Sequence, residues 1–365
     1  MKNPIALAVT AFLLGCFPVR VTARGIQPDP TLAALQAALD LDRRGECREA
    51  LQKYQALLSN ASVNLNLQLR AYVLQQMADA HNGLGDYAKG EEKAREALRL
   101  LAGANGRNTR TFAAAEGVLA DALTGEGNYL GAKKVAEQAV SLGKETFGAR
   151  APRFGLLLTT LANALGAQGE HRRSLKLYRQ AVGIMQKAGE GNRIELGTAY
   201  LNLAGAYIAK GNAKKALELV ASARATWKQV LPSNNSFTVY ALITEMLGYK
   251  KLKAYREAEA LIPEMLEVGI SKLGPSHPDR VMLLGIAASV YVAQKKYGLA
   301  APLLKQGVEL SKRLFRPGNP LSRVLLANYS YVLAELGQTE EASRVRAESE
   351  VLLAFPEREQ VPGVR

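Results

Sequence analysis

The chain has few of the residues that form covalent cross-links, metal centres or catalytic centres. Of 365 residues, 2 are Cys and 3 are His, and the sequence contains no Cys-x-x-Cys, His-Glu-x-x-His, phosphate loop or nucleophile elbow. The histidines, His81, His171 and His277, lie far apart in the sequence, which argues against a shared metal site. The sequence therefore predicts no catalytic residue, no cofactor and no metal: the protein is not expected to be an enzyme.

Aromatic residues are also scarce, at 6% of the chain, and they do not alternate with basic residues as a nucleic-acid-binding surface would require. The formal net charge is nevertheless +14, which can attract an acidic protein or an anionic membrane surface. The basic residues recur near predicted turns and should form a basic edge. This edge is either an ordinary solvated surface or a docking strip for an acidic partner. Its members are Arg172, Arg173, Lys176, Arg179, Lys210, Lys214, Lys215, Lys250, Lys251, Lys253, Arg256, Lys295 and Lys296.

The N-terminal segment has the pattern of a secretory signal peptide. Lys2 precedes an apolar run over residues 5–17, and the small residues before position 24 suit cleavage after Ala23. The run is shorter than the roughly 20 residues that span a bilayer. We therefore expect residues 1–23 to be a signal peptide and the protein to be exported, periplasmic or secreted. A further alternative is that this segment is not cleaved and anchors the protein to the membrane.

The alternative is a lipoprotein, because residues 13–16, Leu-Leu-Gly-Cys, resemble a lipobox with Cys16 as the lipidated residue. In that case the protein would be anchored to the membrane. If Cys16 is instead removed with the signal peptide, Cys47 alone remains and no intrachain disulfide can form. We expect Cys47 to pack as a small apolar side chain.

The rest of the chain is periodic. Eight marker positions follow one another at a first step of 40 residues and six further steps of 42. Small side chains recur three residues after each marker and, with Met246 as the exception, nine residues before it. A period of this size indicates one supersecondary unit stacked on copies of itself. The markers are Cys47, Tyr87, Tyr129, His171, Ala213, Tyr255, Tyr297 and Thr339.

Each repeat is predicted to be a helix, a tight turn and a second helix. In repeat 5, apolar residues follow helical spacing over residues 194–208, Gly211 and Asn212 end that helix, and a second apolar run follows. The small residues should lie where the two antiparallel helices approach most closely. Asp29 and Asn319, each before a proline, should cap helices, residues 192–195 and 276–279 should form capping boxes, and Pro263 should kink the second helix of repeat 6.

The repeat pattern resembles the tetratricopeptide repeat, in a long 42-residue form similar to that of kinesin light chain. The inter-repeat signature of that form stands here as Leu-Gly-Pro-Ser-His-Pro-Asp at residues 273–279. Ala-Ala-Pro-Leu at 300–303 and Asn-Leu-Ala at 202–204 match two further motifs. The resemblance covers roughly residues 29–354. It implies an all-α fold: a right-handed superhelical solenoid of about eight antiparallel helix pairs over residues 24–355, followed by a C-terminal tail over residues 356–365.

In this family the first helices line a concave groove that holds peptides. The resemblance therefore implies that positions twelve, eleven and eight residues before each marker, with Tyr240 beside them, bind a protein or peptide partner. The Lys and Asn clamp that some relatives use for a terminal carboxylate is absent, which disfavours a chaperone C-terminus as the ligand. The expected groove residues are Gln75, Asp79, Thr159, Asn163, Asn202, Tyr240, Thr244, Asn328 and Tyr331.

Two functions remain open from the sequence. The first is an exported scaffold that holds a segment of a partner protein in its groove, without catalysis. The second is a structural or assembly subunit of a cell-envelope complex, which would use its edge or its convex surface. Nucleic acid is not an expected partner, and a membrane is expected only if Cys16 is lipidated.

Overall fold

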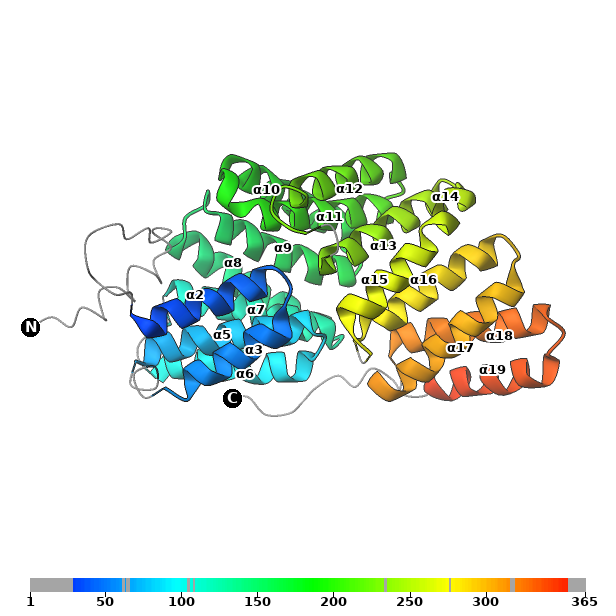
Figure 1. Cartoon of the computed structure of the whole chain (residues 1–365), viewed down its shortest axis with the longest axis horizontal. Helices are drawn as coiled ribbons and strands as arrows, with labels where there is room; N and C mark the ends of the chain where they lie inside the picture. Colours follow the sequence, from blue (N-terminus) through cyan, green and yellow to red (C-terminus); the bar gives the residue numbers. More distant parts are fainter. Residues whose placement is uncertain are drawn as a thin grey trace, which may run out of the picture. The chain divides into compact units, whose positions relative to one another are not determined.

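The computed structural model describes residues 29–353, apart from residues 61, 62, 64, 65, 104, 105, 108, 233, 234, 276 and 316–318. The predictions for the signal peptide, Cys16 and the tail at 356–365 lie outside these residues. The described part is all-α, as predicted, and no strand occurs in it (Figure 1). None of its helices combines the length and the apolar character needed to cross a membrane.

In the residues that the structure describes, the helices form eight successive pairs, and every second helix begins at a marker residue. The pairs are α2 (Pro30–Arg43) with α3 (Cys47–Leu58), α5 (Leu67–Gly83) with α6 (Tyr87–Gly103), α7 (Arg110–Gly125) with α8 (Tyr129–Thr146), α9 (Pro152–Ala167) with α10 (His171–Lys187), α11 (Arg193–Ala209) with α12 (Ala213–Trp227), α13 (Ser236–Lys251) with α14 (Tyr255–Ala260) and α15 (Ile262–Leu273), α16 (Asp279–Ala293) with α17 (Tyr297–Leu314), and α18 (Pro320–Glu335) with α19 (Thr339–Leu353).

The second helix of repeat 6 is divided in two, as Pro263 predicted. The helix α14 ends at Ala260, and α15 begins at Ile262 with the proline in its first turn. Proline lacks the backbone N–H that would continue the hydrogen-bond ladder, and its ring clashes with the preceding turn. A short 3-10 turn over Glu190–Asn192 precedes α11.

The residue two positions before each marker adopts the left-handed conformation that turns the chain from the first helix to the second. In repeats 1–5 and 8 this residue is Gly, for example Gly127 with φ 84°. In repeats 6 and 7 it is Lys253 (φ 61°) and Lys295 (φ 57°). Side chains other than Gly are strained in this region, so the two lysines weaken otherwise equivalent turns.

The small residues lie where the paired helices meet, as predicted. In repeat 4 the hydroxyl of Ser174, three residues after the marker, donates to the carbonyl oxygen of Ala162, nine residues before it, at 2.8 Å. In repeat 8 the direction is reversed: the hydroxyl of Ser330, nine residues before the marker, donates to the carbonyl oxygen of Ala342, three residues after it, at 2.9 Å. A side chain can reach the backbone of the partner helix this way only when both residues are small.

The helix starts match the sequence only in part. The side chains of Asp29 and Asn319 cap their helices as predicted. Asn192 forms no side-chain cap, so the predicted capping box at residues 192–195 is wrong, because the 3-10 turn brings the chain directly into α11. At α16 the cap is His277, which is buried and whose Nδ1 accepts the backbone N–H of Asp279 at 3.1 Å.

The chain forms two compact units. Unit 1 holds residues up to Lys210 together with residues 218–233, and unit 2 holds Gly211–Leu217 together with residues from 234 onward. In unit 1, α5 contacts α7, α7 contacts α9 and α9 contacts α11; in unit 2, α13 contacts α16 and α16 contacts α18. First helices thus stack directly on one another within each unit. We call the surface that they share the first-helix face of that unit.

Candidate functional site

The first-helix face of unit 1 carries a row of polar side chains at one position of successive repeats. Eight residues before the marker stand Asp79 on α5, Asp121 on α7 and Asn163 on α9. Helices packed side by side have axes about 8–10 Å apart, so successive members of the row are separated by a similar distance. The helix periodicity places the row, because the position is the same in each 42-residue unit.

Two members of this row are held by hydrogen bonds. The Thr160 hydroxyl, which stands eleven residues before the next marker, donates to Asp121 at 2.9 Å. Tyr178, seven residues after its own marker, donates its hydroxyl to the amide oxygen of Asn163. The geometry therefore defines two donors for this position: one from the following repeat and one from the second helix of the same repeat.

Asp79 lacks both of these donors. The residue that corresponds to Thr160 is Val118, and the residue that corresponds to Tyr178 is Ala94; neither can donate a hydrogen bond from its side chain. Asp79 is exposed to solvent and forms no hydrogen bond or ion pair with any described residue. No side chain of the described residues donates to Asp79. At the same position of the next two repeats, Asp121 and Asn163 each accept a hydrogen bond.

A second carboxylate, Asp42, lies beside Asp79. Asp42 stands five residues before its marker, as Lys250 does in repeat 6, and Lys250 Nζ donates at 2.8 Å to Ser289, which is eight residues before the next marker. The same register places Asp42 against Asp79. Tyr54 donates to Asp42 at 3.3 Å.

The side chain of Gln75 is almost fully buried, with 4% exposed, and lies one helical turn before Asp79. Its Nε2 donates to Gln76 Oε1 at 2.9 Å, and Gln76 in turn is hydrogen-bonded to Tyr54, the donor to Asp42. Hydrogen bonds through Gln76 and Tyr54 thus link the Gln75 amide to the Asp42 carboxylate. Its Oε1 is buried and has no donor, which is costly for a polar atom.

The three carboxylates are hard to ionise together. Burial, and secondly the charge of Asp79, raise the pKa of Asp42 to about 7. Burial also raises the pKa of Asp121 to about 7, against the hydrogen bonds from Thr160 and Asn163. The surrounding protein raises the pKa of Asp79, although the residue retains access to solvent, and Arg153 opposes that shift.

The other predicted groove residues of unit 1 are buried or half-buried, and two of them are hydrogen-bonded. Thr159 is buried, and its hydroxyl donates to the Gly155 carbonyl at 3.2 Å within the same helix. Asn163 is half-buried and bonded as described above. Asn202 on α11 is half-buried.

In unit 2 the predicted residues bond mainly to one another and to neighbouring repeats. Tyr240 donates to Asp279 Oδ2 at 2.7 Å, so its hydroxyl binds the start of the next repeat, and Thr244 donates to the Tyr240 carbonyl at 2.8 Å. Asn328 is half-buried. Tyr331 is exposed and packs edge to face on Tyr297, with ring centres 5.9 Å apart. This face offers aromatic and apolar surface and no acidic row.

Several members of the predicted basic edge have acidic partners within their own unit. In unit 1, Arg173 forms ion pairs with Glu170 and Glu137. In unit 2, Lys296 pairs with Glu259, and the burial of Lys250 lowers the pKa of its amine. These contacts reduce the charge available to an outside partner.

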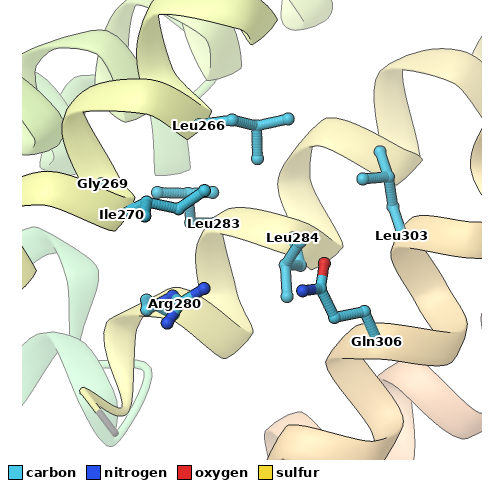
Figure 2. Close-up of a pocket in the computed structure, with 8 residues that line it drawn as sticks. All are labelled: Leu266, Gly269, Ile270, Arg280, Leu283, Leu284, Leu303 and Gln306. Atoms are coloured by element: carbon cyan, nitrogen blue, oxygen red, sulfur yellow. The ribbon is translucent and has the colours of Figure 1, made fainter. Parts of the chain in front are cut away.

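A small cavity lies in unit 2 between α15, α16 and α17. Its volume is about 70 Å³, and Figure 2 shows leucine side chains from all three helices around it, with the Arg280 guanidinium and the Gln306 amide at its side. Cofactor and ligand pockets usually measure about 300–1,000 Å³. The cavity is a packing defect between helices.

Sequence reasoning missed Asp42 and Asp121. Asp121 stands one period after Asp79, so a comparison of all eight repeats at this position would have found it. Asp42 belongs to the shorter first repeat and to a different repeat position, so only the packing of α2 onto the stack shows its place. In the described part of the chain, no group of three His, Cys, Asp or Glu residues could hold a metal ion.

Comparison with known proteins agrees with this architecture. Residues 153–229, which form α9 to α12, match the tetratricopeptide repeat family model. The fold is similar to that of NprR in complex with its cognate peptide NprX, with a TM-score of 0.61, 14% identity and 91% of each chain covered. No curated protein sequence matched.

Two further structures are similar. The Rap protein complexed with Competence and Sporulation Factor gives a TM-score of 0.57 at 13% identity, over 87% of this chain and 76% of that one. A chain of the APC/C hetero-tetramer Cut9-Hcn1 gives a TM-score of 0.65 at 16% identity, over 89% of this chain and 53% of that one, so the present chain spans about half the length of that chain. These likenesses show the fold, an α-helical repeat stack; the kinesin light chain type of repeat stays a prediction.

Proposed function

We propose that this protein is a scaffold that binds a segment of a partner protein on its first-helix faces. The observation that carries the proposal is the polar row of unit 1, where Asp79 is solvent-accessible and receives no hydrogen bond from the described residues. Backbone N–H groups and side-chain donors of an extended peptide would bond to this carboxylate. The similar folds of NprR and Rap, each solved with a peptide or factor, support this type of ligand.

We propose further that the scaffold is exported. The support is the N-terminal sequence: Lys2, the apolar run and the small residues before position 24. The intact mass of the protein, measured separately in soluble and membrane fractions, tests this. Loss of residues 1–23 in the soluble fraction supports export, a membrane-bound species acylated at Cys16 indicates a lipoprotein, and a full-length mass contradicts export.

Site-directed photocrosslinking in the producing cell tests the scaffold function. A photoreactive residue at Asn202, on the first-helix face of unit 1, should crosslink to a partner. The same probe at Arg95, a half-exposed ion-paired residue on the second helix α6, should not. Asn202→Arg should abolish the interaction, whereas charge reversal at Arg173 on the basic edge should leave it. Crosslinks from Arg95 alone would contradict the proposal and favour the assembly role.

A further inference from the structure

We infer that one edge of unit 2 docks on a membrane surface that carries anionic lipid headgroups. The edge consists of the turns between the two helices of repeats 5, 6 and 7, over residues 211–217, 250–260 and 294–297, and we call it the turn strip. The inference concerns a different surface from the first-helix faces and goes beyond the proposed function.

Contacts between neighbouring repeats join these turns into one surface. In the turn of repeat 7, Gln294 and Lys296 each donate at 2.8 Å to the Glu259 carboxylate on α14 of repeat 6. Leu217 of the first segment packs against Gly248, near the end of α13. The turns after α13 and α16 follow one another along one edge of unit 2 (Figure 1). Packed helices lie about 8–10 Å apart, so the charges of successive turns form a continuous strip.

The turn strip carries an excess of positive charge. It holds eight basic residues and two acidic ones, Glu257 and Glu259, and Glu259 is already paired with Lys296. The strip ends at repeat 8, whose turn carries the exposed Glu335 and Glu340. A group of four to eight basic residues is typical of surfaces that bind anionic lipids. Five exposed side chains of the strip form no ion pair or hydrogen bond with any described residue: Lys214, Lys251, Lys253, Arg256 and Lys295.

Two of these five lysines are kept at a cost to the fold. Lys253 and Lys295 adopt the left-handed conformation, with φ 61° and 57°, at the turn position where the other six repeats carry Gly. A lysine is strained there and a glycine is not. Backbone strain that persists where an unstrained residue would fit points to a function of the side chain. Both lysine side chains are exposed, so that function is a contact outside the chain.

The composition of the strip favours a lipid surface over an acidic protein segment. Seven of its eight basic residues are lysine, a compact and strongly hydrated point charge, whereas specific bonds to carboxylates are typical of arginine. Leu252 is exposed between Lys251 and Lys253, and an apolar side chain among cations can enter the headgroup region of a bilayer. Charges at the tips of three successive turns fit a flat anionic surface.

The test is co-sedimentation with lipid vesicles. The protein is the chain from residue 24 onward, which keeps every described residue and lacks the N-terminal apolar run, so this run cannot itself bind the vesicles. The vesicles are phosphatidylcholine alone, or phosphatidylcholine with about 30% phosphatidylglycerol. The protein should sediment with the anionic vesicles and not with the neutral ones, and raising the salt from about 0.1 M to about 0.5 M should release it.

The key variant is Lys253→Gly combined with Lys295→Gly, which gives both turns the residue that the other repeats have. Each basic residue near an anionic membrane contributes about fivefold in affinity, so the loss of two should weaken binding roughly 25-fold. The control is Lys272→Gln combined with Lys305→Gln, which removes the same charge from exposed positions of α15 and α17 outside the strip. The control should keep its affinity within about twofold, and thermal unfolding followed by circular dichroism verifies that both variants are folded.

Three results would overturn the inference. An equal loss of affinity in both variants would show that only net charge matters, and equal binding to neutral vesicles would show that headgroup charge does not. Failure to bind either vesicle, with retention on immobilised polyglutamate that the Lys253→Gly and Lys295→Gly variant loses, would assign the strip to an acidic protein instead. None of these results bears on crosslinking from Asn202, which tests the scaffold function separately.

Discussion

Glu116 on α7 is a charged residue at a position built for leucine. Thirteen residues before the marker, five of the other seven repeats carry a leucine that is at most 4% exposed; repeats 1 and 5 carry Ala34 and Tyr200. The leucines are Leu74, Leu158, Leu242, Leu284 and Leu326. Glu116 is half-buried, and its Oε2 is buried without a hydrogen-bond partner. Burial raises the pKa of Glu116 from 4.5 to about 7. We predict that Glu116→Leu stabilises the protein, and more so at high pH.

The magnitude follows from this pKa shift. A carboxyl group whose pKa is raised in the folded state destabilises the fold as pH rises from about 4.5 to 7, because the unfolded chain ionises first. The shift corresponds to about 3 kcal/mol above pH 7 for a fully shielded group. Because Glu116 keeps partial contact with water, we take about half, or ~1.5 kcal/mol. Leucine adds about 1 kcal/mol of apolar burial at any pH.

The assay is urea unfolding of the wild type and Glu116→Leu at pH 5 and pH 8, followed by far-ultraviolet circular dichroism. We expect the variant to gain about 2–3 kcal/mol at pH 8 and roughly 1 kcal/mol less at pH 5. The titration of other carboxylates cancels in the difference. Glu116→Gln, which removes only the charge, should recover the pH-dependent part alone. An equal gain at both pH values, or a loss of stability, would refute the reasoning.

Further predictions concern the glycines and the turns. Gly197→Ala would place a Cβ 2.2 Å from Trp227 Nε1, which donates to a backbone carbonyl at 3.1 Å, so it should cost about 1–3 kcal/mol and shift the emission of this single tryptophan. The control is Gly205→Ala on the same helix, where the Cβ meets nothing within 4 Å; it should leave the emission unchanged and raise the melting temperature. Gly127→Ala, at φ 84°, should cost about 1 kcal/mol in urea unfolding, whereas Lys295→Gly should leave stability unchanged or slightly raised; equal losses in both would contradict the turn assignment.

The local structure could be predicted from the sequence because it depends on a repeated pattern. The period correctly predicted a helix, a turn and a second helix in every repeat, and the structure shows that each marker, from Cys47 to Thr339, is the first residue of a second helix. Pro263 located the break in the sixth second helix, because loss of a backbone donor acts within one turn. The capping box predicted at residues 192–195 does not form, because a helix cap depends on how the preceding loop enters the helix. The local pattern alone does not predict that path.

The candidate site could be predicted only in part. The sequence predicted that Gln75, Asp79 and Asn163 lie on the first-helix face because of their position in the repeat, whereas the structure buries Gln75. It did not show that Asp79 is without a donor, because the donors of that position come from a neighbouring repeat and from the second helix. Nor did it show that the Tyr240 hydroxyl is used by Asp279 of the next repeat. These pairings join residues about 15 to 39 positions apart.

What the sequence by itself determined is therefore the repeating unit: its length, its two helices and the residues at which those helices touch. These features follow from interactions within one helix or one turn. Only the tertiary structure decided which polar atoms remain unpaired, because that depends on which side chains successive repeats bring together. In unit 1, Val118 and Ala94 stand where Thr160 and Tyr178 stand elsewhere, so Asp79 lacks the side-chain donors that Asp121 and Asn163 have.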